Sequence, residues 1–290
     1  KFRAPEMQAI LEAMIAEAPE AASIDYIDRL PFERVFRVHA EPVGKGTGMF
    51  VLLFRDQSEA RRIDRMRADF IANASHELRT PLAAISGFVE TLRGPARNDA
   101  AARERFLQIM QDQTARMARL IEDLLSLSRL EMKAPALAGR RVELSSVVDS
   151  VVETLRTLAL DNGVEIENLF GTAPVEVSGD RDELFQVFQN LVENACKYGR
   201  DGGRVQIARV IGNGEIGVEV RDFGPGIAAE HIPRVTERFY RIDVESSRLQ
   251  KGTGLGLSIV KHIVSRHRGR LAIASEPGKG AAFTVYLPTG

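Results

Sequence analysis

The first residue that could carry chemistry is His76, which lies with Glu77 and Thr80 in the middle of a long amphipathic helical pattern. A neutral imidazole is a nucleophile near pH 7, and an adjacent carboxylate such as Glu77 can orient the ring and stabilise the positive charge that develops on it. Thr80 lies one helical turn after His76, so its hydroxyl shares that face. These residue types indicate nucleophilic chemistry at His76. A solvated helix face is the common alternative for a single histidine.

A second polar group lies on a predicted helix at residues 181–198. Asn190 and Asn194 are one turn apart and present amide oxygens along one edge, which suits a hard cation or its water ligands. Lys197 adds a positive charge for a phosphate group, and Tyr198 adds a ring on which a base can stack. This pattern predicts a site for a phosphorylated ligand and a metal ion, although asparagine pairs also occur on exposed helices.

Two glycine-containing segments complete the set of candidate residues. Asp222 ends a predicted strand before Gly224 and Gly226, so its carboxylate can accept a hydrogen bond from an exocyclic amine while the backbone approaches a ligand closely. The second segment opens a helix, whose free N–H groups and dipole favour an anion, and it consists of Gly252, Thr253, Gly254, Leu255 and Gly256. Its spacing is neither that of a Walker loop nor that of the dinucleotide fingerprint.

Two long amphipathic helices must position His76. Apolar residues recur in steps of three and four from Ile63 to Leu92, and again from Phe106 to Leu127, with Gly94-Pro95 between the two runs. Such a hairpin cannot cover its own apolar stripes. We therefore predict that residues 58–133 pair with a second copy as a dimeric four-helix bundle. A monomeric hairpin packed on its neighbouring domain is the alternative.

The candidate binding residues belong to an α/β sandwich predicted at residues 141–290, after a small-residue linker at 134–140. Helical and extended runs alternate there, with helices expected at 145–160, 181–198 and 255–267 and strands at 164–169, 204–210, 216–220, 270–274 and 282–287. Residues 1–57 hold a helical pattern at 5–18 and extended runs at 32–40 and 49–54. They have too little core to form a domain alone, so the expected fold class is multidomain α+β with a partial N-terminal module.

Length and composition exclude several classes of protein. A chain of 290 residues with 44% hydrophobic and 27% charged residues is globular and has room for two or three domains. The formal net charge of -1 gives no general attraction to nucleic acid or anionic lipid. The longest apolar run, at 49–54, is too short to span a bilayer, and a single cysteine, Cys196, fits a reducing compartment. We expect a fragment that contacts neither nucleic acid nor a membrane.

Taken in order, the motifs resemble those of the two-component sensor histidine kinases. Five segments correspond to the H box, the N box, the first G box, the F box and the second G box of that family, and these are His76–Pro81, Asn190–Tyr198, Asp222–Gly226, Glu237–Arg241 and Gly252–Leu257. The sandwich resembles the ATP-binding domain shared with Hsp90, MutL and gyrase. Residues 1–57 resemble the C-terminal part of a PAS sensor domain. Parts of the N and F boxes are similar to those of phosphate-regulon sensor kinases.

The resemblance implies ATP and Mg²⁺ as cofactors and a role for each candidate residue. Asn194 would hold Mg²⁺ with support from Asn190, while Lys197 and Arg241 would contact phosphates. Tyr198 and Asp222 would contact the adenine, within a cradle formed by Gly224, Gly226 and the 252–256 segment under a lid at 243–251. His76 would attack the γ-phosphate, Glu77 would orient its ring, and Thr80 would help to place a water molecule during dephosphorylation of the partner.

The resemblance also implies a partner and a location. The phosphoryl group would pass to an aspartate on the receiver domain of a response regulator, and the hairpin would form a homodimer. The fragment would be cytoplasmic, and the family allows an inner-membrane anchor in the full-length protein. Two other functions stay open, a conformational ATPase of the same superfamily and a non-catalytic sensor scaffold. Phosphatase activity toward the regulator is compatible with Glu77 and Thr80.

Overall fold

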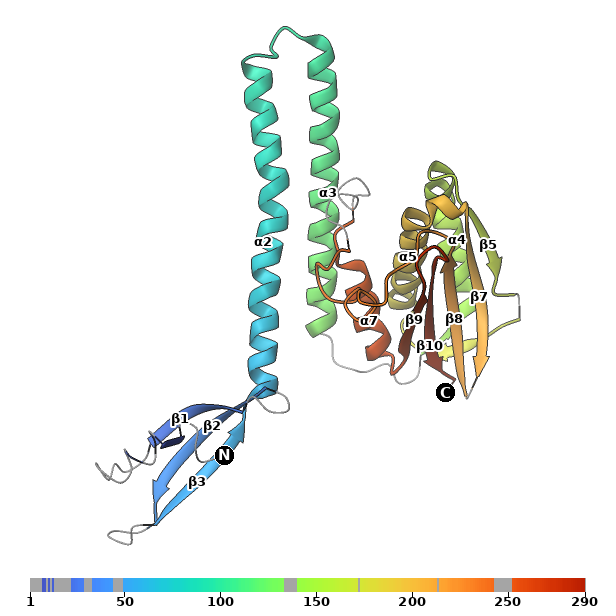
Figure 1. Ribbon diagram of the computed structural model, residues 1–290. Coiled ribbons are helices and arrows are strands. Elements are labelled where there is room, and N and C mark those ends of the chain that lie inside the picture. The colour runs from blue at the N-terminus through green and yellow to red at the C-terminus, as the bar shows by residue number, and fades with distance from the viewer. Residues whose placement is uncertain are drawn as a thin grey trace. The chain divides into compact units, whose positions relative to one another are not determined.

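The computed structural model of the chain comprises two compact units, Lys1–Glu77 and Leu78–Gly290. The described residues are 7–8, 10, 12, 22–28, 33–43, 49–132, 140–171, 173–212, 214–242 and 252–289. A long helix, α2 (Ser58–Arg93), contributes residues to both units (Figure 1). Within these ranges no helix is both long and apolar enough to cross a membrane.

The N-terminal unit is built on an antiparallel sheet with the strand order β1-β2-β3. The three strands are β1 (Ala22–Asp28), β2 (Arg34–Pro42) and β3 (Phe50–Asp56). Because side chains alternate along a strand, Tyr26, Val38 and Ala40 share one face, where they form a buried cluster with Met7 and Ile10. The two extended runs predicted in this region are confirmed as β2 and β3.

Strand β1 was not predicted, although Ser23 and Asp25 alternate with Ala22, Ile24 and Tyr26 in the pattern of a half-buried strand. The helix predicted at 5–18 lies mostly outside the described residues, although its described members are helical. The glycine-rich turn at 44–48 lies wholly outside them. The assignment of residues 1–57 to a PAS domain stays a prediction, as do the other domain boundaries.

Helix α2 starts directly after the sheet. The backbone N–H of Ser58 donates to Asp56 Oδ1 at 2.9 Å, and the Ser58 hydroxyl oxygen accepts from the N–H of Val35 on β2 at 2.9 Å. Arg61 on the first turn of the helix forms an ion pair with Asp25 on β1, which Arg37 also contacts. The helix start is therefore fixed to all three strands of the sheet by side-chain contacts.

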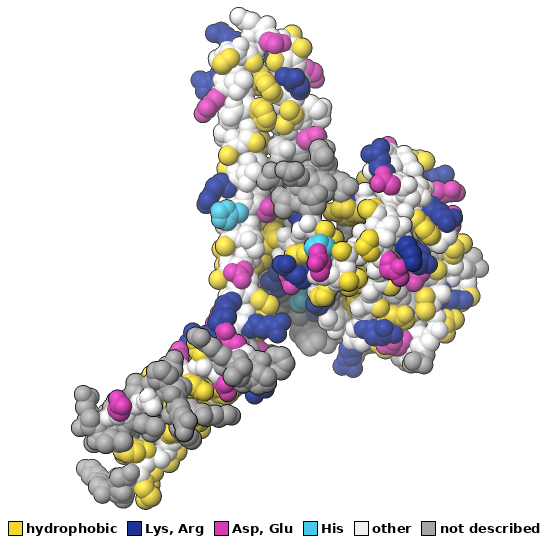
Figure 2. Space-filling model, viewed as in Figure 1, with side chains coloured by type: hydrophobic (Ala, Val, Ile, Leu, Met, Phe, Trp, Pro, Cys, Tyr) yellow, Lys and Arg dark blue, Asp and Glu magenta, His cyan; other side chains and the backbone are white. Residues whose placement is uncertain are grey.

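Helices α2 and α3 (Ala100–Met132) form the predicted hairpin. The side chain of Asp99 accepts from the N–H of Ala102 and so caps the start of α3, while Phe88 and Phe106 stack across the hairpin with ring centroids 5.1 Å apart. Apolar side chains remain on the hairpin surface among charged ones (Figure 2), and those at least 38% exposed include Leu82, Val89, Leu107, Ile121 and Leu125. These are the side chains that the predicted second copy would cover.

The C-terminal part is a two-layer α/β domain. A five-stranded sheet with the order β5-β7-β8-β10-β9 carries three helices on one face (Figure 1), and β5 pairs in parallel with β7 while the other pairs are antiparallel. The elements are β4 (Arg141–Glu143), α4 (Leu144–Asp161), β5 (Glu165–Leu169), β6 (Glu176–Ser178), α5 (Arg181–Tyr198), η1 (Arg200–Gly202), β7 (Arg204–Gly212), β8 (Glu215–Asp222), α7 (Gly256–Arg266), β9 (Arg270–Ser275) and β10 (Ala281–Pro288). All the helices and strands predicted for this domain are present. The β4-β6 pair was not predicted because each strand has only three residues.

The core of this domain lies between the helices and the sheet. The apolar faces of α4, α5 and α7 supply side chains that are at most 5% exposed, including Val151, Leu191 and Ile263. Cys196 on α5 is completely buried among them, as expected for a small apolar residue. Because each helix buries only one face in the core, the polar edge of α5 stays accessible and can line the site described below.

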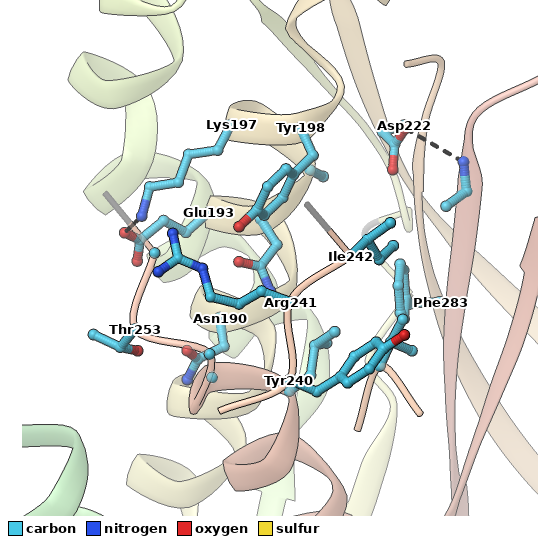
Figure 3. Close-up of a pocket in the computed structure, with 18 of the residues that line it drawn as sticks. Asn190, Glu193, Lys197, Tyr198, Asp222, Tyr240, Arg241, Ile242, Thr253 and Phe283 are labelled. Carbon is cyan, nitrogen blue, oxygen red and sulfur yellow. Dashed lines mark hydrogen bonds and ion pairs between the residues drawn. The ribbon is translucent and has the colours of Figure 1, made fainter. Parts of the chain in front are cut away.

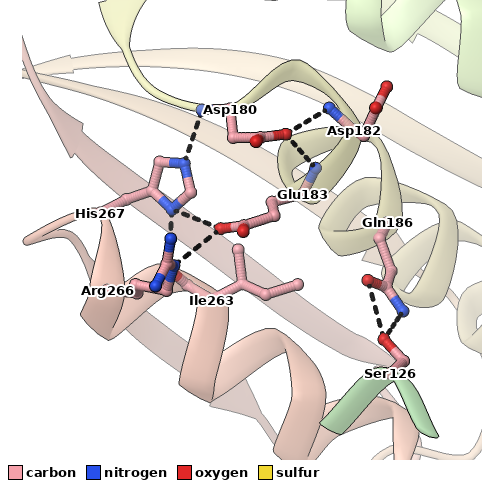
Figure 4. Close-up of polar contacts among 8 residues, drawn as sticks. All are labelled: Ser126, Asp180, Asp182, Glu183, Gln186, Ile263, Arg266 and His267. Atoms are coloured by element: carbon pink, nitrogen blue, oxygen red, sulfur yellow. Dashed lines mark hydrogen bonds and ion pairs between the residues drawn. The ribbon is translucent and has the colours of Figure 1, made fainter. Parts of the chain in front are cut away.

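A buried polar cluster holds the start of α5 (Figure 4). Asp180 caps the helix, because its Oδ1 accepts from the N–H groups of Asp182 and Glu183 at 3.0 and 3.2 Å. The ring of His267, at the end of α7, accepts from the Asp180 N–H through Nε2 at 3.1 Å and donates to the Ile263 carbonyl through Nδ1. Both ring nitrogens are therefore used by the neutral form of His267.

We expect the stability of this domain to fall as the pH decreases below about 6.5, the ordinary pKa of histidine. Burial lowers the pKa of His267, and a proton on Nε2 would break the bond from the Asp180 N–H. Glu183 and Arg266 also face the ring. Since the unfolded chain takes up this proton more readily than the folded chain, acid favours unfolding, and the stability contribution is fully present only above that pH.

Thermal unfolding of the chain at pH 7.5 and pH 5.5 measures this effect. We expect His267→Gln to have a smaller difference in Tm between the two pH values than the wild-type chain. His262→Gln, on the same helix but only half-buried, serves as the matched control and should keep the wild-type difference. An unchanged pH dependence in His267→Gln would contradict the assignment.

Candidate functional site

A cavity of about 730 Å³ opens at the edge of α5, between that helix, the end of β8, the start of α7 and one side of α3 (Figure 3). This volume is typical of sites that bind small molecules and cofactors. It brings together eleven of the residues predicted to bind nucleotide, which are Asn190, Asn194, Lys197, Tyr198, Asp222, Gly226, Arg241, Gly252, Thr253, Gly254 and Gly256. Of the other two, Gly224 donates its N–H to Asp222 at 3.0 Å, and Leu255 is completely buried beneath the start of α7. Neither lines the cavity.

Helix α5 presents its polar edge to the cavity because its opposite face is in the core. The side-chain Nδ2 of Asn190 donates to the Gln186 carbonyl at 2.8 Å, which directs Oδ1 toward the first turn of α7. A Cβ atom on Gly256 would lie 2.6 Å from that oxygen, so a larger residue there would displace the Asn190 amide group. Asn194 lies one turn further along and is half-buried. Two amide groups therefore line the same side of the cavity.

Lys197 forms an ion pair with Glu193, one turn before it on α5 (Figure 3). The two side chains are 17% and 29% exposed, so the pair lies at the wall of the cavity rather than in bulk solvent. Glu193 was not predicted as a site residue. Glu193 precedes Lys197 by four residues on one helix, and this spacing could have indicated the ion pair from the sequence.

Asp222 is 6% exposed at the end of β8, and burial raises the pKa of its carboxyl group. Its Oδ1 accepts from the N–H groups of Gly224 and Ala281 at 3.0 and 3.3 Å, which fixes the carboxylate. A Cβ on Gly199 would lie 2.5 Å from the Asp222 Cβ. Glycine at 199 thus leaves the room that this carboxylate needs.

The loop at 252–256 leads into the N-terminus of α7. The hydroxyl of Thr253 accepts from the Leu255 N–H at 3.3 Å and donates to Asp123 Oδ2 on α3 at 2.7 Å. Gly254 has φ +75°, in the left-handed region that favours glycine. Its carbonyl accepts from the N–H of Phe239 at 2.8 Å, which connects the loop to the 237–241 segment. The lid predicted at 243–251 lies outside the described residues.

His76, Glu77 and Thr80 lie together on α2, without interruption of the helix at Pro81. His76 and Thr80 are exposed and one turn apart, while Glu77 is half-buried. None of the three lines the cavity. The chain therefore has two candidate functional features. One is the exposed imidazole on the helical hairpin, and the other is the cavity at the α/β domain.

The other histidines and the cysteine do not line the cavity. Among the described residues no group of three or more His, Cys, Asp or Glu side chains is arranged to hold a metal ion.

The fold and the cavity define the class of the protein. Residues 179–290 match the family described as histidine kinase-, DNA gyrase B- and HSP90-like ATPase, and residues 66–133 match the His Kinase A (phospho-acceptor) domain. The order of these two domains, with His76 in the first, is that of two-component signalling kinases.

The chain carries the ATPase and phosphoacceptor domains of the sensor histidine kinases and is similar to such kinases over most of its length. It is 39% identical over 242 residues to the phosphate regulon sensor protein PhoR of Pseudomonas aeruginosa, a match that covers 83% of this chain and 54% of that protein. It is also 39% identical over 240 residues to the sensor-like histidine kinase SenX3 of Mycolicibacterium smegmatis, covering 82% of this chain and 62% of that one. The similarity to phosphate-regulon sensors inferred from the motifs is confirmed.

A solved structure agrees with this assignment. The full-length histidine kinase ShkA in complex with AMPPNP matches with a TM-score of 0.55 and 26% identity, over 76% of this chain and 45% of that one. The chain spans about half the length of the curated relatives that it matches.

Proposed function

We propose that this chain autophosphorylates on His76 with ATP and then transfers the phosphoryl group to an aspartate on the receiver domain of a response regulator. The observation that carries the proposal is the cavity in which Asn190, Lys197 and Asp222 meet the glycine-rich start of α7, in a chain that also presents an exposed imidazole on α2. The ATP analogue named for the ShkA complex supports ATP as the ligand.

In this proposal the cavity binds ATP through groups at both of its ends. Asp222 accepts a hydrogen bond from the adenine amine, since Gly224 and Ala281 already fix its orientation. Lys197 and Arg241 contact the phosphates, and the free N–H groups at the start of α7 add a further site for negative charge. Tyr198 lies at the rim and covers one face of the base.

The amide oxygens of Asn190 and Asn194 suit Mg²⁺, a hard cation that prefers oxygen ligands and shares its coordination with phosphates. The direction of Asn190 Oδ1, away from its bond to Gln186, fits this role. Bound Mg²⁺ would neutralise negative charge on the β- and γ-phosphates.

The reaction itself needs positioning and charge neutralisation more than covalent chemistry from the protein. A ring nitrogen of neutral His76 attacks the γ-phosphorus, the bond from that phosphorus to the β,γ-bridging oxygen breaks, and ADP leaves with the electron pair. Glu77 orients the imidazole and stabilises its charge. When the protein acts as a phosphatase, Thr80 helps to place the water molecule that hydrolyses the phosphorylated aspartate of the regulator.

Incubation of the chain with γ-labelled ATP and Mg²⁺ tests the proposed function. We expect protein-bound label that is lost in acid and kept in base, as a phosphoramidate bond requires, and that passes to a receiver domain added later. Chelation of Mg²⁺ with EDTA should prevent labelling. Release of free phosphate without labelled protein would instead support a conformational ATPase, and failure to bind ATP would support a scaffold without catalysis.

A further inference from the structure

Helix α3 of the hairpin also supplies side chains to the cavity, which the sequence did not predict. Asp123 accepts from the Thr253 hydroxyl at 2.7 Å, and Ser126 exchanges hydrogen bonds of 2.8 and 3.2 Å with the side chain of Gln186 on α5 (Figure 4). These bonds join α3 to the glycine-rich loop and to α5. The wall of the cavity is thus completed by the domain that carries the phosphoacceptor.

Arg119 lies one turn before Asp123 on α3 and lines the same cavity. Its Nε is inaccessible to solvent and has no hydrogen-bond partner among the described residues. Burial of a guanidinium nitrogen without a partner is unfavourable in free energy, because the nitrogen loses its hydrogen bonds to water and forms none with the protein. A ligand with anionic oxygens in the cavity would supply the missing acceptor, and a guanidinium group is well suited to phosphate.

Two of the acidic side chains that line the cavity with Arg119 are engaged by other residues. Lys197 is paired with Glu193, and Asp123 is engaged by Thr253, so neither of these acidic groups is directed at Arg119 in the hydrogen bonds of this region. Burial raises the pKa of Asp123, which reduces its competition for the guanidinium group.

We propose that Arg119 is an additional phosphate-binding residue of the nucleotide site, supplied by the hairpin rather than by the ATPase domain. This inference rests on the proposed binding of ATP in the cavity. Asp123 and Ser126 then act as positioning residues, because their bonds to Thr253 and Gln186 hold α3 where Arg119 can reach the phosphates. Nucleotide affinity consequently depends on contact between the two domains.

Binding of Mg-ATP and of adenosine to the full chain, measured by calorimetry, tests this inference. We expect Arg119→Ala to weaken Mg-ATP binding by about tenfold or more, the usual effect of losing a charge-assisted hydrogen bond. Adenosine has no phosphate, so its affinity should not change. Arg119→Lys, which keeps the charge, should recover part of the loss. Arg103→Ala removes the same charge from an exposed position on α3 and should bind both ligands normally.

The outcomes separate this inference from the proposed function. Normal Mg-ATP binding by Arg119→Ala overturns the inference alone, provided that the wild-type chain binds ATP. An equal loss of adenosine and Mg-ATP affinity would also overturn it, because Arg119 would then support the shape of the cavity rather than contact phosphate. A wild-type chain that does not bind Mg-ATP would overturn the proposed function together with the inference.

Discussion

Replacement of His76 by alanine is expected to remove all acid-labile label acquired from γ-labelled ATP while Mg-ATP affinity stays within about twofold of the wild-type value. The side chain is exposed on α2 and does not line the nucleotide cavity, so its loss removes the nucleophile without altering the binding residues. Truncation of an exposed helical side chain also changes stability little. Scintillation counting of the labelled protein and calorimetry of ATP binding check the two parts of the prediction.

His39→Ala is the matched control, because it removes a half-buried imidazole from β2 in the N-terminal sheet. It should keep wild-type labelling. Acid-labile label that persists in His76→Ala would show that another residue accepts the phosphoryl group and would reject the assignment of His76.

The second large effect is expected for Asp222→Asn, which should weaken ATP binding by about a hundredfold or more. The asparagine oxygen can still accept from the N–H groups of Gly224 and Ala281, so the local fold should be preserved. The new NH₂ group then faces the adenine amine, and two donors meet where an acceptor is required. A site that accepts a hydrogen bond from a ligand N–H loses much of its affinity for that ligand when the accepting group is replaced.

Asp201→Asn makes the same chemical change at an exposed position on η1, outside the cavity, and should bind ATP normally. Because burial raises the pKa of Asp222, protonation of its carboxyl group should also weaken ATP binding at a pH above the range in which an exposed aspartate titrates. ATP affinity of Asp222→Asn equal to that of the wild-type chain would reject the contact with adenine.

Much of the fold could be predicted from periodicity. The hairpin helices, α5 and α7 each carry one stripe of apolar residues, and strands β7 and β8 are rich in valine and isoleucine. Strand β1 was missed although serine and aspartate alternate with its apolar residues, a pattern that itself indicates a half-buried strand. Strands β4 and β6 were missed because three residues give too short a pattern.

The candidate site could be predicted only where its residues form local motifs. Asn190, Asn194 and Lys197 share one helix edge, and the glycines at 252, 254 and 256 precede a helix, so sequence spacing was sufficient. Asp123 and Arg119 carry no such signal. The bond between Asp123 and Thr253 joins residues 130 positions apart, and only the packing of α3 brings them together.

Burial of Cys196 has a practical consequence for experiments on this protein. Its side chain has no exposed surface, and burial raises the pKa of the thiol to about 11, so little thiolate is present near neutral pH. Maleimide reagents should therefore leave the native cysteine unmodified in the folded chain. Single cysteines introduced on α2 and on η1 could then carry fluorophores or spin labels, and distances between them would report domain movement during turnover without removal of Cys196.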